Sequence, residues 1–127
     1  MKMLKHCMML VVILCNVAFL TSCDKTELFF HGNVRVTPSM AKEGDEVIFT
    51  MSKSDITHNG ENVVKSVVFY IDGNEIGESS DENSNYAVKY KVMGLIAGDH
   101  AVTAHCKPKK NVKINVSISP ATLTIEE

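Results

Sequence analysis

The chain has 127 residues, with 13 basic and 15 acidic side chains and a formal net charge of −2. A chain of this length fits one domain with a hydrophobic core that needs no metal or disulfide cross-links. The slightly acidic balance excludes general affinity for nucleic acid, so no nucleic-acid partner is expected.

Residues 1–22 have the pattern of a secretory signal peptide. Lys2, Lys5 and His6 give a basic start, and an apolar run of 14 residues follows at positions 7–20, broken only by Asn16. This run is too short for a membrane-spanning helix, which needs about 20 apolar residues. It suits the apolar core of a signal peptide.

The tetrapeptide Leu20-Thr21-Ser22-Cys23 directly follows the apolar run. It resembles the lipobox of bacterial lipoproteins, in which small residues precede the cysteine that becomes the mature N-terminus. The resemblance implies cleavage before Cys23, a thioether from Cys23 Sγ to diacylglycerol, and acylation of the freed amine. Two or more acyl chains anchor a protein stably, whereas one chain binds only marginally. The alternative is an ordinary secretory signal with an incidental cysteine.

We therefore expect Cys23 to anchor the protein in the cell envelope, in the outer membrane, with the periplasmic and surface faces both open. Cleavage would leave 11 basic and 15 acidic residues. It would also leave Cys106 as the one unmodified cysteine, since Cys7 and Cys15 lie in the signal peptide. Cys106 shares its phase with Val102 and Ala104, which favours a buried thiol over a reactive one.

Residues 23–32 are expected to be the acylated cysteine and a tether. Leu28, Phe29 and Phe30 are too apolar for a solvated tether, so they form either a first edge strand or a contact with the bottom of the domain. From residue 33 onward the apolar residues recur with period two, which indicates β-strands. The expected strands are 33–37, 46–52, 63–71, 75–78, 86–92, 100–107, 112–119 and 121–125.

Turn residues separate these strands. Asp72-Gly73-Asn74 supplies the positive φ angles of a tight hairpin turn. Pro108 suits position i+1 of a type I turn, which makes residues 107–113 a hairpin tip. The apolar phase changes from even to odd positions across Pro120, and this change predicts a bulge or kink.

Three stretches of this sequence resemble bacterial extracellular immunoglobulin-like domains. They are Val36-Thr37-Pro38 with residues 43–49, then residues 67–77 from Val67 to Gly77, and residues 94–104 from Gly94 to Ala104. The resemblance covers about residues 33–119. It implies an all-β, immunoglobulin-like sandwich of seven to eight antiparallel strands over residues 33–127. The shared residues mark turns and core positions, so they imply a fold rather than an activity.

The polar residues do not suggest a catalytic or metal site. His105 and Cys106 are adjacent on one strand and therefore point to opposite faces, as do His100 and His105, which are five apart. No spacing matches a zinc site, and we interpret the histidines as exposed loop residues. No cofactor or metal and no enzymatic activity are expected.

Residues 81–85 match the opening of a calcium-binding loop, Asp-x-Asn-x-Asn. The match then fails, because Tyr86 replaces the required glycine and Val92 replaces the bidentate glutamate. A looser calcium site that uses Asp81 and Asn83, with Asp72, stays open beside a solvated turn.

Four lysines gather within seven residues and are the candidate partner contacts, Lys107, Lys109, Lys110 and Lys113. They could bind an acidic partner, or they could form a solvated turn that blunts the sheet edge. A flat glycan-binding face would need exposed aromatic rings, and only Tyr70 clearly points away from the core.

These observations predict a non-catalytic, lipid-anchored envelope protein. Its domain would serve a binding or structural accessory role toward an unknown protein or glycan. The alternative is an inhibitor or a substrate-delivery subunit of an envelope enzyme or a glycan-uptake system.

Overall fold

The computed structural model describes residues 27–127, so the signal peptide and Cys23 lie outside the described residues. Short strands with period-two burial make up most of this part. The strands are β1 (Glu27–Thr37), β2 (Met40–Ala41), β3 (Glu46–Met51), β4 (Thr57–His58), β5 (Glu61–Asn62), β6 (Val64–Ile71), β7 (Asn74–Ser79), β8 (Val88–Lys91), β9 (Gly98–Pro108), β10 (Lys113–Ser119) and β11 (Ala121–Ile125). Two short 3-10 turns, η1 (Lys53–Ile56) and η2 (Glu82–Ser84), interrupt them.

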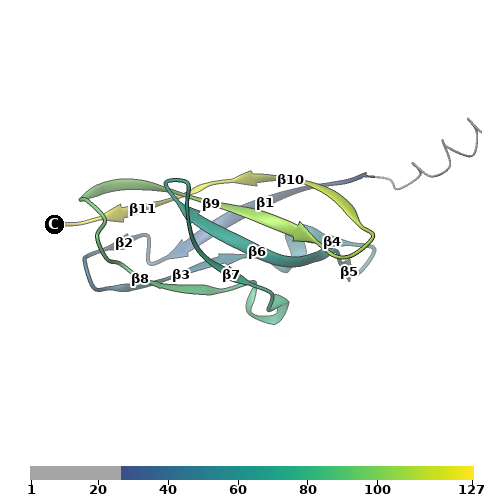
Figure 1. Cartoon of the computed structure of the whole chain (residues 1–127), viewed down its shortest axis with the longest axis horizontal. Coiled ribbons are helices and arrows are strands. Elements are labelled where there is room, and N and C mark those ends of the chain that lie inside the picture. Colours follow the sequence, from purple (N-terminus) through teal and green to yellow (C-terminus); the bar gives the residue numbers. More distant parts are fainter. Residues whose placement is uncertain (1–26) are drawn as a thin grey trace, which may run out of the picture.

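The strands form two sheets that pack face to face, as Figure 1 shows. One sheet has the order β10-β1-β3-β8 and the other the order β2-β11-β9-β6-β7, while β4 and β5 form a small hairpin of their own. The immunoglobulin-like β-sandwich expected from the sequence is thereby confirmed. No helix among residues 27–127 is both long and apolar enough to cross a membrane.

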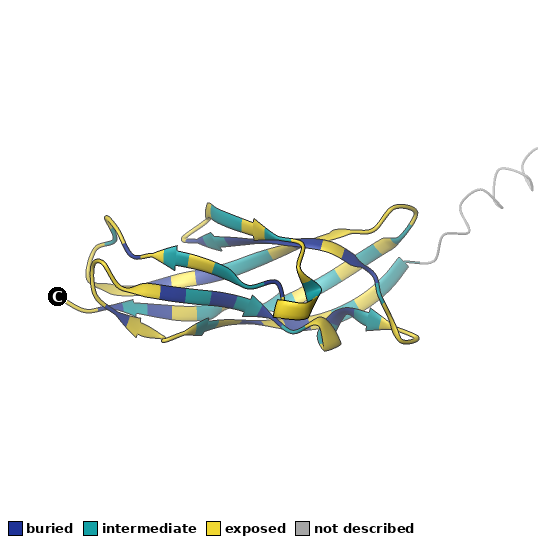
Figure 2. Cartoon of the chain, turned by 90° about the horizontal axis from the view of Figure 1, so that it is seen from below, coloured by how far each residue is buried: buried dark blue, intermediate teal, exposed yellow. Residues whose placement is uncertain are grey.

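The core lies between the two sheets and follows the predicted strand phases. The rings of Phe49 and Phe69, one from each sheet, stack with their centroids 6.0 Å apart. Figure 2 shows buried and exposed residues alternating along the strands. The residues that are fully shielded from solvent on the principal strands include Val47, Phe49, Val67, Phe69, Val102 and Leu123.

The sandwich begins at Glu27, so the expected tether over residues 23–32 ends earlier than predicted. Residues 27–33 pair with β10, and Leu28 and Phe30 pack against the core. This apolar stretch therefore forms a strand, as the first of the two alternatives proposed, but β1 lies between β10 and β3 and not at the edge of the sheet. Its backbone groups gain hydrogen bonds that a tether would leave to water.

Two strand pairs are parallel, which departs from the expected antiparallel sandwich. β1 runs parallel to β10, and β2 runs parallel to β11. These parallel pairs arise from the path that the chain takes after β9. The chain crosses to the other sheet as β10 and, at Pro120, crosses back as β11. The predicted kink at Pro120 is confirmed, and it marks the change of sheet.

The predicted hairpin tip at residues 107–113 is wrong for the same reason. β9 and β10 belong to different sheets, so the connection between them is an arch across the sandwich. Pro108 is the last residue of β9. The turn itself is closed by a 3.1 Å hydrogen bond from Val112 N to Lys109 O. Asn111 lies in the left-handed region, with φ of 67°.

The hairpin turn between β6 and β7 is confirmed. Asp72 and Gly73 have φ angles of 51° and 84°, as a two-residue turn with two positive φ angles requires. The strand predicted over 86–92 is shorter than expected and spans Val88–Lys91 as β8. Tyr86 has a φ angle of 54°, which takes it out of the strand conformation.

Different strands and loops lie at the two ends of the sandwich, which we call the proximal and the distal end. The proximal end is the one where β1 begins, and it holds residues 57–62 and the turn 109–112. The distal end holds β2, the loops 42–45 and 92–97, and the C-terminus. Figure 1 shows the C-terminus at the end opposite the start of β1.

Candidate functional site

The four candidate lysines do not act together in the structure. Lys107 lies on the outer face of β9, and its Nζ is 3.2 Å from a carboxylate oxygen of Glu78. Glu78 also accepts a 2.6 Å hydrogen bond from Ser66 Oγ. The Ser66 hydroxyl, followed by the Lys107 ammonium, lowers the pKa of Glu78. Lys107 therefore has a partner within the domain, on the face of the sheet.

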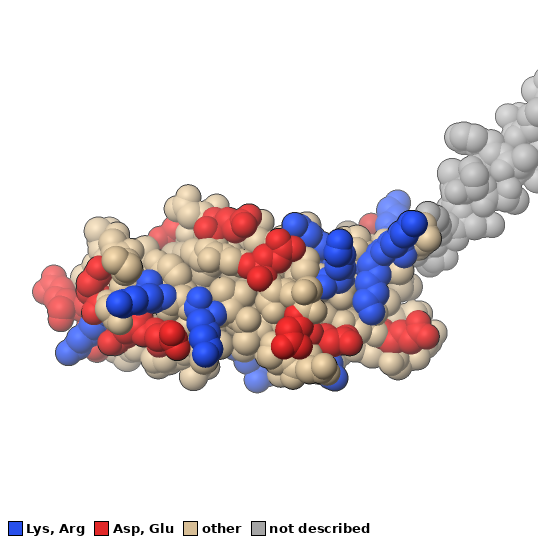
Figure 3. Space-filling view, turned by 60° about the horizontal axis from the view of Figure 1, so that its bottom comes forward, with Lys and Arg blue, Asp and Glu red and all other residues tan. Residues whose placement is uncertain are grey.

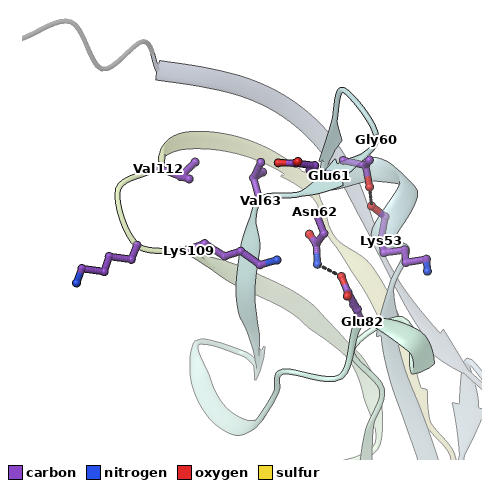
Figure 4. Close-up of a pocket in the computed structure, with 10 residues that line it drawn as sticks. Lys53, Gly60, Glu61, Asn62, Val63, Glu82, Lys109 and Val112 are labelled. Carbon is purple, nitrogen blue, oxygen red and sulfur yellow. Dashed lines mark hydrogen bonds between the residues drawn. The ribbon is translucent and has the colours of Figure 1, made fainter.

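Lys109 and Lys110 instead line a cleft of about 540 Å³ at the proximal end. Lys53 adds a third amine, and Glu61 and Glu82 add carboxylates. Lys113 is exposed at the start of β10. In Figure 4 the Lys109 side chain extends from its turn toward Asn62 and Val63, where β5 passes into β6.

A partly buried polar network, with the buried Tyr86 at its centre, joins the segments that line the cleft. Asn62 Nδ2 donates to both Glu82 Oε2 and Tyr86 Oη. Asn62 Oδ1 accepts a 3.1 Å bond from Val64 N, and Tyr86 Oη donates a 3.1 Å bond to Val64 O. Each of these groups lies on a different segment, so the network joins β5, η2 and β6.

The lysine-bearing turn is fixed to this framework through the backbone. Lys109 N donates a 3.0 Å hydrogen bond to Val63 O. Burial raises the pKa of Tyr86, the phenol at the centre of the network. Hydrogen bonds therefore fix the segments that line the cleft. Lys53, Lys109 and Lys110 add three ammonium groups on flexible side chains, a pattern that suits electrostatic contact.

His100 is buried in the structure, so the prediction of an exposed histidine is wrong for this residue. His31, His58 and His105 are exposed as predicted, although His31 lies on β1 and not in a tether. His100 is 6% exposed, and it shares the phase of Val102 and Cys106 on β9. That shared phase is the signal in the sequence that places it inside.

Both ring nitrogens of His100 face hydrogen-bond acceptors. Nδ1 is 2.5 Å from Asp72 Oδ2, and Nε2 is 2.7 Å from the carbonyl oxygen of Ile96. Neutral imidazole carries one N–H, so only the imidazolium donates to both partners. The Asp72 hydrogen bond, then the Ile96 carbonyl, raise the pKa of His100, and the nearby Asp99 carboxylate acts in the same direction.

The His100–Asp72 pair makes stability depend on pH. The raised His100 pKa contributes stability that is complete below about pH 6.5 and lost as pH rises through the folded pKa. The His100 hydrogen bond also lowers the pKa of Asp72, which contributes stability above about pH 4. We therefore expect His100→Gln to cost more unfolding free energy near about pH 5.5 than near about pH 8.

Urea unfolding of wild type and His100→Gln at both pH values measures this difference. His105→Gln, on the exposed face of the same strand, is the matched control and should show no pH-dependent loss. An equal loss at both pH values for His100→Gln would contradict the doubly donating imidazolium.

The predicted burial of Cys106 is confirmed. The residue is 5% exposed, and its Sγ lies 3.6 Å from Met51 Sδ. Burial raises the pKa of this thiol to about 11, so the thiolate needed for nucleophilic or redox chemistry is scarce at neutral pH. Cys106 also lines a hollow of about 260 Å³ between β9 and β10, beside Ile114, Val116 and Ile118.

The residues of the possible calcium site make hydrogen bonds within the domain. The Asp81 carboxylate caps η2 by accepting a 3.1 Å hydrogen bond from Asn83 N. Asp72 lies at the other end of β7 and is bound to His100 and Ala101 N. Within residues 27–127 no group of three or more His, Cys, Asp or Glu side chains is placed to hold a metal ion.

The exposed aromatic residue that sequence reasoning missed is Phe29. Its side chain is 72% exposed on β1, whereas Tyr70, the expected outward ring, is half-buried. From Leu28 onward β1 alternates between exposed and less exposed residues, and Phe29 shares the outward phase with His31. The proximal end therefore exposes an aromatic side chain, Phe29, in addition to the charged residues of the cleft.

The lipid-attachment residue Cys23 and the lipobox residues Leu20, Thr21 and Ser22 lie outside the described residues. They stay predictions from the sequence. The described domain begins four residues after Cys23, at Glu27.

Comparison with family models and with curated proteins gives no match. Among solved structures, the chain aligns with a structure described as fibronectin(III)-like modules of Clostridium thermocellum CbhA. The TM-score is 0.44 and the sequence identity 20%, over 76% of this chain and 46% of that chain. This chain therefore matches less than half of the length of that protein.

Proposed function

We propose that this protein is a non-catalytic, lipid-anchored module of the bacterial cell envelope. Its immunoglobulin-like sandwich presents its distal loops to a protein or glycan partner. The acylated Cys23 holds the domain at the outer membrane, and the domain itself stays in water.

The observation that carries the proposal is the short distance along the chain from Cys23 to the first strand. Three residues separate Cys23 from Glu27, the first residue of β1, so four Cα–Cα steps join them. A fully extended chain spans at most about 3.6 Å per residue, so about 14 Å separates the two Cα atoms at most. An acylated Cys23 would therefore keep the proximal end close to the lipid and direct the distal end outward.

The distal end supports a presenting role because its loops are tied to one another. Gly44 N donates a 2.8 Å bond to Val92 O, and Gly94 N donates to the Glu43 carboxylate at 3.1 Å. The loop 92–97 nevertheless exposes two large apolar side chains, Met93 at 64% and Ile96 at 78%. Exposed apolar side chains on an ordered loop suit contact with another molecule.

Replacement of the anchoring residue tests the proposal. Cys23→Ala removes the sulfur that would carry the diacylglycerol, so we expect no incorporation of labelled fatty acid and accumulation of the uncleaved precursor. Labelling in growing cells, followed by separation of membrane and soluble fractions, measures both effects.

Cys15→Ala is the matched control, because it removes a cysteine from the signal peptide and leaves the lipobox intact. It should label as the wild type does. Continued fatty-acid labelling of Cys23→Ala would show that the acyl chains are attached elsewhere and would overturn the anchor at Cys23.

A further inference from the structure

Among residues 27–127, the proximal end of the domain carries lysines that make no ion pair, and they lie beside the first residue of β1. Glu27 of β1 pairs in register with Lys113 of β10, and the turn holding Lys109 and Lys110 directly precedes β10. Figure 3 shows a group of basic side chains on the surface at the proximal end of the domain, on the right of the view. All three lysines are exposed.

These three lysines have no ion-pair partner among residues 27–127, which leaves them available to an external anion. Within residues 27–127 the ion pairs are His100–Asp72 and Lys107–Glu78, and neither uses Lys109, Lys110 or Lys113. Glu82, one of the carboxylates in the cleft, is held by Asn62. An ammonium group on a flexible stem binds phosphate as a point charge.

Phe29 adds an apolar contact to the same region. It pairs in register with Asn115, two residues beyond the Glu27–Lys113 pair, and its side chain is 72% exposed. In strands, residues two apart point to the same face. Phe29 and Lys113 therefore share the outer face of this sheet near its proximal edge. Aromatic rings beside basic groups are typical of surfaces that lie at the membrane interface.

We propose that this proximal surface, formed by Phe29, Lys109, Lys110 and Lys113, lies on the membrane and binds the headgroups of anionic phospholipids. The inference rests on the proposed anchor at Cys23, which limits the distance to Glu27 to about 14 Å. Charges within about one Debye length, roughly 8 Å at physiological salt, interact with an anionic surface. The domain is thereby oriented, and its distal loops face away from the lipid.

Lysine footprinting of the acylated full chain tests this orientation. The protein is purified from bacterial membranes and reconstituted into vesicles of phosphatidylcholine alone or with about one quarter phosphatidylglycerol. An amine reagent that does not cross membranes then labels the lysines, which are quantified by mass spectrometry. On the anionic vesicles we expect at least about threefold less labelling of Lys109, Lys110 and Lys113. The distal lysines Lys42, Lys89 and Lys91 should label equally on both.

Two further conditions sharpen the result. About 0.5 M salt should restore labelling of the proximal lysines, because it screens the headgroup charge. Lys109→Glu/Lys110→Glu should remove the protection of Lys113, whereas the matched exposed pair Lys89→Glu/Lys91→Glu on β8 should leave it unchanged.

The same mass spectra report whether the peptide that begins at Cys23 carries acyl chains. Absence of acyl chains would overturn the anchor and this orientation together. An acylated protein whose proximal lysines label equally on both kinds of vesicle would overturn the orientation alone. Protection that is equally strong on phosphatidylcholine, or that survives high salt, would contradict binding to anionic headgroups.

Discussion

Val102→Asp should destabilise the domain by about 3–5 kcal/mol, because it places an unpaired carboxylate in the centre of the core. Val102 is fully shielded from solvent on β9, where it pairs with Ile71 of β6 and Ala121 of β11. The variant should either melt at least about 12 °C below wild type or fail to fold. Thermal unfolding followed by circular dichroism measures the shift.

His105→Asp is the matched control for this substitution. It introduces the same carboxylate three residues away, on the exposed face of the same strand. We expect its unfolding free energy to stay within about 0.5 kcal/mol of wild type. If the two variants melted at the same temperature, the phase of β9 and the packing of the two sheets would be wrong.

Tyr86→Ala should cost a similar amount, about 3–5 kcal/mol, because it removes a fully buried aromatic side chain and leaves a cavity. Tyr86 also joins three segments of the proximal end, since its hydroxyl donates to Val64 O and accepts from Asn62. Loss of the ring should therefore loosen the cleft as well as the core. Urea unfolding gives the stability, and faster amide exchange at residues 57–62 would report the loosening.

Tyr86→Phe separates the hydrogen bonds from the ring. It keeps the packing but leaves the Val64 carbonyl without its phenolic donor, which should cost about 1–2 kcal/mol. Equal losses for the phenylalanine and alanine variants would show that the ring contributes nothing to packing, contrary to its complete burial.

The strand phases of this chain are predictable because each strand buries one face. Alternation of apolar and polar residues along β3 and β9 is sufficient to identify the core residues Val47, Phe49, Val102 and Cys106. The turn at Asp72-Gly73 is predictable from the positive φ angles that it requires. The change of phase identifies Pro120, although the sequence does not show that the chain changes sheet there.

The long-range features are harder to predict, because they depend on which strands become neighbours. Nothing local distinguishes an arch from a hairpin at Lys109–Val112, so the sequence does not reveal the parallel pairing of β1 with β10. Tyr86 belongs to the expected strand 86–92, but its contacts with Asn62 and Val64 join segments more than 20 residues apart. The polarity of His100 suggests exposure, whereas Asp72 and the Ile96 carbonyl satisfy its ring inside the fold.

The candidate site is predictable only in part. The lysine cluster is visible in the sequence, but the structure divides it into Lys107, which pairs with Glu78, and the proximal lysines beside Glu27. Sequence spacing alone cannot show this division, because it depends on β7 lying beside β6 and bringing Glu78 to the outer face. The contribution of Phe29 likewise depends on the domain beginning at Glu27.

The mass of the mature protein tests most directly whether Cys23 anchors the domain to the membrane. We expect the protein purified from the membrane fraction to begin at Cys23. Its N-terminal peptide should carry the added mass of a diacylglycerol thioether and an amide-linked acyl chain. A mature protein that begins at another residue, or one whose Cys23 carries no lipid, would contradict the proposed lipid anchor at Cys23.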